Sequence, residues 1–200
     1  ANPIKAGSLR LHKTGGQKVP VIVALDGQLI TEREEHEMKE EKGVLVSDAD
    51  RDLLKIVVLN RYADAAPAVG FIKNFGLRSG AMASSVAHDS HNIVAVGADD
   101  ESITRAINLV IMEKGGLSCV SEEESRILPL PVGGLMNSID GYQIAREYIA
   151  IDRMAKSLGS DLGAPFMTLS FMALLVIPHL KMSDRGLFDV DKFSFVPRGE

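Results

Sequence analysis

The chain has 200 residues, of which 46% are hydrophobic and 24% charged, and its net charge is −5. These values are those of a folded globular protein and argue against a disordered chain and against a general nucleic-acid or anionic-membrane surface. The single cysteine excludes an internal disulfide and a four-cysteine zinc site. No signal-peptide pattern is present and no apolar run is long enough to span a bilayer, so we expect a cytoplasmic protein.

The first half of the chain predicts a series of short strands. The opening, to about Pro20, is mixed and glycine-rich, which indicates irregular structure. A β-branched run at residues 19–25 predicts a buried strand, and residues 29–31 follow a turn signal as the returning strand of a hairpin. The charged segment 32–43 indicates a solvated loop or edge. Four more strands, at near ten-residue spacing, are expected at 55–62, 69–76, 80–87 and 92–98.

The second half predicts two helices. An acidic start, apolar residues at helical spacing and a glycine pair at the end predict a helix over 103–114, and similar spacing predicts another over 140–158. A strand at 116–121 completes a strand–helix–strand unit, and 126–136 is expected to be extended before a turn. We also expect a strand near 167–171 and a short closing strand. The predicted helix residues in the core are Ile107, Val110, Ile111, Ile144, Ile151 and Leu158, with Met136, Met154, Met167 and Met172 as further core filler.

These elements predict a single α/β (α+β) domain with a mixed β-sheet and at least two covering helices. The segment AHDSHN is its most polar stretch, with His88 and His91 flanked by Asp89 and Asn92. Three interpretations of this segment are open. A tight turn can use such side chains to cap its own backbone, a ligand such as a nucleobase can be recognised by their donors and acceptors, and imidazole with carboxylate can bind a metal.

Two glycine pairs allow unusual backbone conformations. Gly115-Gly116 is best explained as a helix stop, whereas Gly133-Gly134 permits either a plain turn or a close approach to a ligand. No dinucleotide-binding, P-loop or G-x-S-x-G motif occurs in the sequence.

Four segments carry a family resemblance. They are DGQLIT, GLRSGAMASSVAHDSHNIVAVGADDE, LPLPVGGLM and PFMTLSFMALLVIPHLKMSDRGLFDVDKFSFV, which together cover nearly the whole chain. In this order they resemble the C-terminal domain of adenine deaminase of the bacterial type, in the amidohydrolase superfamily. The resemblance implies an enzyme of purine salvage and adenine catabolism that hydrolyses adenine to hypoxanthine and ammonia, with manganese or iron held in a TIM barrel N-terminal to this domain.

The barrel is expected to lie outside this chain, which has no H-x-H and too few residues for eight βα units. The zinc-deaminase signature H-x-E with P-C-x-x-C is also absent. The chain, which starts ANPIKAG without methionine, is therefore expected to be an excised part or a domain that exists alone. We assign no catalytic residue with certainty within residues 1–200, and we expect the chain to hold no metal and to be inactive by itself.

The resemblance suggests two roles for the domain. In the first, His88, Asp89, His91 and Asn92 form a loop that covers the barrel active site and contacts the purine, with Gly133 and Gly134 beside it; the same loop could instead only fix the domain interface. In the second, a non-catalytic binding or assembly domain holds another subunit through its apolar C-terminal stretch. Exposure of residues 171–180 would favour that second role. The expected partners are the barrel, adenine and further copies in a homo-oligomer, with no nucleic acid and no membrane.

Overall fold

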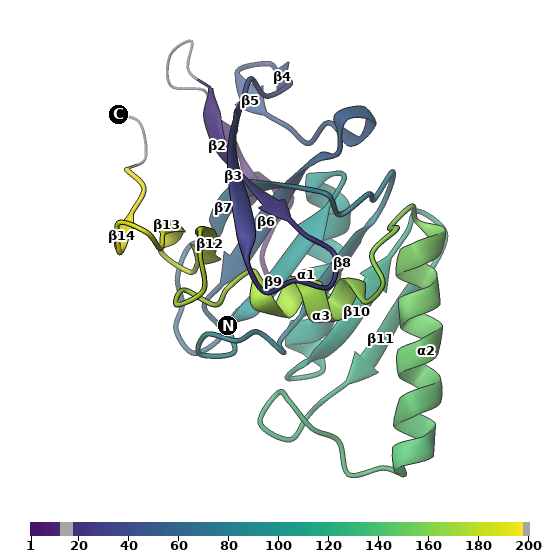
Figure 1. The fold of residues 1–200 in the computed structure, drawn as a ribbon. Coiled ribbons are helices and arrows are strands. Elements are labelled where there is room, and N and C mark those ends of the chain that lie inside the picture. Colours follow the sequence, from purple (N-terminus) through teal and green to yellow (C-terminus); the bar gives the residue numbers. More distant parts are fainter. Residues whose placement is uncertain (13–17, 198–200) are drawn as a thin grey trace.

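A computed structural model of the chain describes residues 1–12 and 18–197, and its centre is a mixed eight-stranded sheet (Figure 1). The strand order is β11-β10-β8-β9-β6-β7-β2-β3; only β2 and β7 pair in parallel. The strands are β2 (Val19–Ala24), β3 (Thr31–His36), β6 (Leu53–Leu59), β7 (Ala68–Lys73), β8 (Ala81–Ser84), β9 (Ile93–Gly97), β10 (Gly116–Val120) and β11 (Ser125–Pro129).

Helices and two small sheets surround this central sheet. The helices are α1 (Asp100–Met112), α2 (Gly141–Ser157) and α3 (Pro165–Phe171), with 3-10 turns η1 (Ala6–Leu9) and η2 (Ala49–Arg51). One small sheet contains β1 (Leu11–His12), β4 (Glu40–Glu41) and β5 (Val44–Leu45). The other contains β12 (Leu180–Ser183), β13 (Gly186–Asp189) and β14 (Ser194–Phe195). None of the helices in the described ranges has the length and hydrophobicity that a bilayer crossing needs.

The central strands are buried on both faces, which makes the domain three layers deep. Every residue of β6 is buried, as its β-branched run predicts. Ile56 and Val58 belong to the core that α2 and α3 cover, whereas Val57 and Leu59 belong to the core that α1 covers. Because successive strand residues point to opposite faces, the sheet lies between α1 on one side and α2 with α3 on the other (Figure 1).

The helix α1 forms where its periodicity predicts it. The carboxylate of Asp99 accepts the Ser102 N–H at 2.7 Å and caps the first turn. Ile107 and Val110 are buried against the sheet. The strands β9 and β10 on either side of α1 run in the same direction, but β8 lies between them and is antiparallel to both. The strand–helix–strand prediction is therefore correct for the order of elements, and the unit is split by one strand.

One predicted element has the wrong type. Residues 167–171 were predicted as a strand, but they belong to the helix α3, which starts with Pro165 at its first turn. Proline is favoured there because N–H groups in the first helical turn have no acceptor within the helix, so the N–H that proline lacks is not missed. Phe166 and Leu169, three positions apart, are buried on one face of α3. The short apolar run therefore has helical spacing and not the spacing of a strand.

Several burial predictions are also wrong. Ile111, Ile144 and Leu158 are half-buried and pack at the margin of the core rather than inside it. Met136 and Met167 are 59% and 51% exposed, so they are not core filler, in contrast to the buried Met154 and Met172. The predicted hairpin is present, but its returning strand is β3 at residues 31–36 rather than 29–31, and this strand forms the charged edge of the sheet. Part of the opening predicted to be irregular, residues 13–17, lies outside the described residues.

A buried lysine provides a test of the packing. Lys181, on β12, is buried and donates from Nζ to the Leu29 carbonyl at 2.6 Å. Among the residues that the structure describes, no carboxylate forms an ion pair with it. Burial lowers the pKa of Lys181 from its usual 10.5 to about 8. Between these two pH values the unfolded chain binds more protons than the folded one, so this group makes stability rise with pH.

We therefore expect Lys181→Met to stabilise the fold at neutral pH. The free energy of unfolding should rise by about 1–3 kcal/mol at pH 7, because the variant no longer buries an ammonium group. The difference between variant and parent should shrink as pH approaches 10. Urea unfolding of both proteins at several pH values between 7 and 10 measures this difference, and a constant difference across that range would contradict the assignment.

Candidate functional site

Polar groups from three chain segments meet at the end of the sheet where β6 and β8 finish. The segments follow β6, β8 and β11 and comprise residues 60–62, 85–92 and 130–136. The six site residues predicted from sequence lie in the second and third segments. We call this region the loop cluster, defined by Arg61, Tyr62, His88, Asp89, His91, Asn92, Gly133 and Gly134.

Asp89 and Asn92 build the turn between β8 and β9. The Asp89 carboxylate accepts the backbone N–H of Asn92 at 3.2 Å and its side-chain Nδ2 at 2.9 Å. Asn92 is buried, and its Oδ1 accepts the backbone N–H of Arg61 at 3.3 Å. These two residues therefore do what the turn interpretation of AHDSHN expects: they satisfy local backbone groups.

The two histidines do not take part in that capping. The ring of His88 packs on Phe171 with centroids 4.5 Å apart, and its backbone N–H donates to the Ser170 carbonyl at 2.9 Å. The ring of His91 meets the His88 ring edge-on at 6.3 Å. His91 has a left-handed backbone with φ of 58°, and its Nδ1 is buried without a hydrogen-bond partner among the described residues. A buried imidazole nitrogen without a partner is unusual, because most buried polar atoms in folded proteins are hydrogen-bonded.

The glycine pair lies directly beside the histidine loop. Gly133 and Gly134 both have positive φ, in the turn closed by the bridge between Val132 and Met136. The hydroxyl of Ser85 donates to the Gly134 carbonyl at 2.6 Å, which fixes this turn to the end of β8. The structure thus brings together all the site residues predicted from sequence, although more than 40 positions separate their two segments.

Arg61 and Tyr62 are members of the cluster that the sequence did not predict. The guanidinium of Arg61 donates from Nε to the His91 carbonyl and from Nη2 to the Gly133 carbonyl, both at 2.6 Å. The hydroxyl of Tyr62 donates to the Ser90 carbonyl at 2.7 Å. Their only local signal is a polar and aromatic pair directly after an apolar strand, which does not reveal contacts with residues 30 and 72 positions away.

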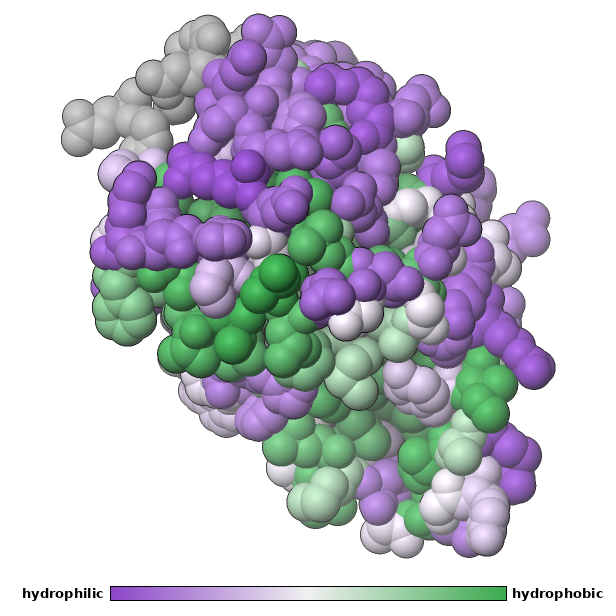
Figure 2. Space-filling model, viewed as in Figure 1, coloured by the Kyte–Doolittle hydropathy of each residue, from purple (hydrophilic) through white to green (hydrophobic). Residues whose placement is uncertain are grey.

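Exposed apolar side chains follow the loop cluster along the chain. They belong to the loop after β11 and to the start and middle of α2, and Tyr142 is 79% exposed. Figure 2 shows hydrophobic residues gathered over the region of α3, hydrophilic residues over the β4–β5 end of the molecule, and a mixture of both along α2. We call the following set the apolar rim: Val132, Met136, Ile139, Tyr142 and Ile149. Exposed apolar groups next to a polar cluster are typical of a surface that contacts another protein part.

A metal site formed by this chain alone would need several ligand side chains close together. Nowhere in residues 1–12 and 18–197 do three or more His, Cys, Asp or Glu side chains gather so that they could hold a metal ion. His88 is stacked on Phe171, and Asp89 is engaged with Asn92.

Burial raises the pKa of the Cys119 thiol to about 12, which keeps it protonated and unreactive at neutral pH.

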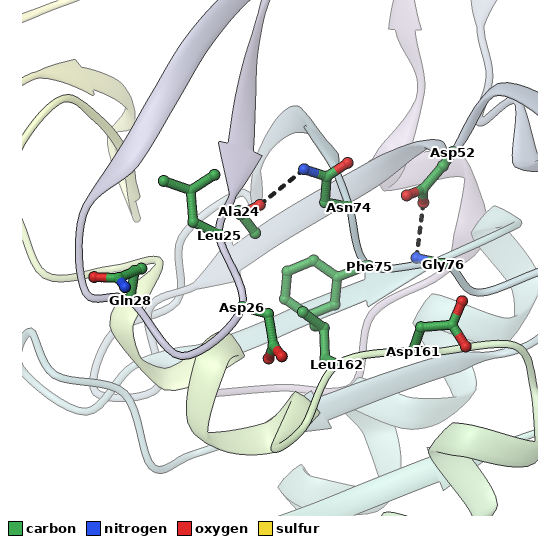
Figure 3. A pocket seen from close by; sticks show the side chains of 10 residues that line it. All are labelled: Ala24, Leu25, Asp26, Gln28, Asp52, Asn74, Phe75, Gly76, Asp161 and Leu162. Carbon is green, nitrogen blue, oxygen red and sulfur yellow. Dashed lines mark hydrogen bonds between the residues drawn. The ribbon is translucent and has the colours of Figure 1, made fainter.

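A separate pocket lies at the other end of the sheet (Figure 3). Its volume is about 610 Å³, and Phe75 and Leu162 supply apolar walls. The Asp52 carboxylate accepts the Gly76 N–H at 2.8 Å, and burial raises its pKa; Asp26 accepts the Gly163 N–H at 2.9 Å. These two carboxylates tie chain segments together, which is a structural role.

The pocket and the loop cluster are far apart. Asp52 directly precedes β6, and Arg61 follows it by two positions. The seven residues of β6, at roughly 3.3 Å per residue, separate them by about 20 Å. The pocket was not predicted from sequence because its walls come from distant segments.

The fold and the loop cluster define the class of this chain: a three-layer α/β domain whose polar loops gather at one end of a mixed sheet. The chain belongs to the adenine deaminase C-terminal domain family, whose model matches residues 28–194. It is 53% identical over 185 residues to an adenine deaminase of Methanosarcina acetivorans, covering 92% of this chain and 34% of the relative.

Other relatives carry the same name. An adenine deaminase of Salinibacter ruber is 49% identical over 200 residues, with 99% of this chain and 36% of the relative covered. One of Borreliella burgdorferi is 46% identical over 189 residues, with 92% and 34% covered. The chain therefore spans about a third of the length of these curated relatives. This agrees with the family resemblance found in the sequence.

Proposed function

We propose that this chain is the C-terminal domain of an adenine deaminase, which hydrolyses adenine to hypoxanthine and ammonia, and that its loop cluster covers the active site of the enzyme. The observation that carries the proposal is the match of residues 28–194 to this family, together with relatives named adenine deaminase of which the chain spans about a third. The rest of the enzyme, in this proposal, includes an amidohydrolase barrel that holds manganese or iron. When bound, that metal ion would supply an activated water for hydrolysis.

The geometry of the loop cluster supports a covering role. His91 offers a buried Nδ1 that has no partner within the described chain, and the His88 ring is held against Phe171. A purine ring presents donors and acceptors at its edge and an apolar face, so imidazole groups can both hydrogen-bond to it and stack on it. Loops that cover an active site also exclude bulk water, which strengthens the polar contacts inside.

The apolar rim supports a direct contact between this domain and the barrel. Val132 and Met136 lie on either side of the glycine pair in the chain. The apolar rim therefore starts within the same turn that contributes Gly133 and Gly134 to the loop cluster. Docking of the barrel here would bury them and bring the histidines to its mouth. The cluster then acts in two ways: it positions polar groups, and its border seals the site.

The runner-up role, an assembly domain that uses residues 171–180, receives less support. Phe171 is half-buried under His88, Met172 and Ala173 are buried, and Val176 is the most exposed apolar residue of this stretch at 68%. Most of this stretch therefore packs inside the domain.

We nevertheless expect the intact deaminase to be a cytoplasmic homo-oligomer that serves purine salvage.

The proposal predicts that this chain alone is inactive. Residues 1–200, supplied with manganese or iron, should release no ammonia from adenine, because the described residues hold no metal centre. The full-length enzyme under the same conditions should convert adenine to hypoxanthine, which is followed by ultraviolet absorbance and by ammonia release. Turnover by the isolated chain at a rate comparable with the full-length enzyme would contradict the proposal.

A further inference from the structure

Arg61 is the residue through which the segments of the loop cluster are joined. Its guanidinium bonds the carbonyls of His91 and Gly133, and its Nη2 also donates to the Tyr62 hydroxyl at 2.9 Å. The Tyr62 hydroxyl in turn bonds the Ser90 carbonyl. One planar cation therefore fixes two separate loops at once, which a flexible ammonium group with a single nitrogen would do less well.

The guanidinium is held by neutral groups. Within residues 1–12 and 18–197, no carboxylate forms an ion pair with Arg61, and its charge interacts with carbonyl oxygens and with the Tyr62 ring at 4.7 Å. The bond to the His91 carbonyl is significant because His91 has the left-handed backbone, a conformation that non-glycine residues adopt only with support from their surroundings. Arg61 therefore sets the direction of the peptide that carries the His91 ring.

The absence of a side chain at Gly134 makes room for this arrangement. A Cβ built at Gly134 would lie 2.1 Å from Arg61 Nη1 and 2.7 Å from its Cζ, so any other residue would displace the guanidinium. Gly133 has a similar positive φ of 67°, but a Cβ there would meet nothing within 4 Å. The two neighbouring glycines thus have similar backbones, but only at Gly134 would a side chain collide with the Arg61 guanidinium.

We propose that Arg61 is a positioning residue for the deamination reaction, and that Gly134 is required because it accommodates the Arg61 guanidinium. Arg61 does not need to touch the substrate; it orients His91 and holds the glycine turn against the histidine loop. This inference rests on the proposed function, since it assumes that the loop cluster acts at the active site of the intact deaminase.

The test is a cycle of variants in the full-length enzyme, with bound metal and melting temperature measured for each. Arg61→Ala should lower kcat by about 10–100-fold while metal content is retained, because misplaced supporting contacts typically have effects of this size. Gly134→Ala should produce a loss close to that of Arg61→Ala. Gly133→Ala, which has the same backbone strain without the clash, should lose distinctly less. The double variant Arg61→Ala with Gly134→Ala should be no worse than Arg61→Ala alone.

Ethylguanidine at non-denaturing concentration provides a readout that a general loss of structure would not give. It should restore part of the kcat of Arg61→Ala and none of that of the double variant, in which the alanine side chain fills the guanidinium site. Equal losses for the two glycine variants, additive losses in the double variant, or no selective rescue would overturn the inference. If the histidine variants lower turnover but the kcat losses of Arg61→Ala and Gly134→Ala are additive, only the positioning role of Arg61 fails. If no variant of the loop cluster affects turnover, although the effects of Arg61→Ala and Gly134→Ala on the melting temperature are non-additive, the proposed function fails.

Discussion

Replacing Asp100 with alanine should destabilise the domain by about 3 kcal/mol, because it leaves a fully buried ammonium group without its counter-charge. Lys55 lies in the centre of the sheet on β6 and its side chain is 0% exposed. Its Nζ contacts both carboxylate oxygens of Asp100, at 2.7 and 2.9 Å, and the Leu9 carbonyl at 3.1 Å. The pair joins the sheet to the first turn of α1, so its loss also weakens the contact between these two layers.

Glu101 offers a matched control for this prediction. It is also acidic and in the first turn of α1, but its side chain is exposed. Glu101→Ala should change the free energy of unfolding by no more than about 0.5 kcal/mol. Lys55→Met combined with Asp100→Ala should recover much of the stability, because no buried charge then remains unpaired. Urea unfolding of the four proteins measures these differences, and an Asp100→Ala effect no larger than that of Glu101→Ala would contradict the assignment.

The strands and the two long helices were predictable because their patterns are local. A continuous apolar, β-branched run marks β6, and apolar residues every three or four positions mark α1. The short helix α3 was missed for the opposite reason: its seven residues are too few to distinguish helical spacing from a buried strand. Its first residue, Pro165, is favoured in a first helical turn, but one proline does not decide between a helix and a strand.

The site was only partly predictable. Spacing alone left three interpretations of AHDSHN open, and the expectation that Gly133 and Gly134 lie beside it came from the family resemblance. The structure assigns Asp89 and Asn92 to the turn and leaves the two histidine rings for other contacts. Arg61 had no signal in the sequence, because its contacts with His91 and Gly133 are made across the end of the sheet.

The second large expected effect concerns the histidines in the intact deaminase. His88→Ala and His91→Ala should each lower turnover of adenine by about 10–100-fold, since each removes a polar ring that we place at the mouth of the active site. The thermal stability and the metal content should change little, because Asp89 and Asn92 still form the turn. A purely structural role would have the opposite signature: lower stability, by roughly 1–3 kcal/mol, with normal turnover.

His36 supplies the control for these variants. It pairs with Glu34 on β3, the strand at one edge of the sheet, whereas β8, which leads into the histidine loop, lies in the interior. His36→Ala should therefore leave turnover of adenine unchanged. This comparison separates the loss of a particular pair of histidines from the loss of any histidine.

The most direct test of the covering role is the kcat of the His91→Ala enzyme, measured on the same preparation as its metal content and melting temperature. We predict a kcat lowered by about 10–100-fold with the metal retained and the melting temperature nearly that of the parent. A normal kcat with a lowered melting temperature would contradict the covering role and leave the loop cluster as a structural turn. A lowered kcat with the metal lost would also contradict it, because His91 would then be a ligand of the metal itself.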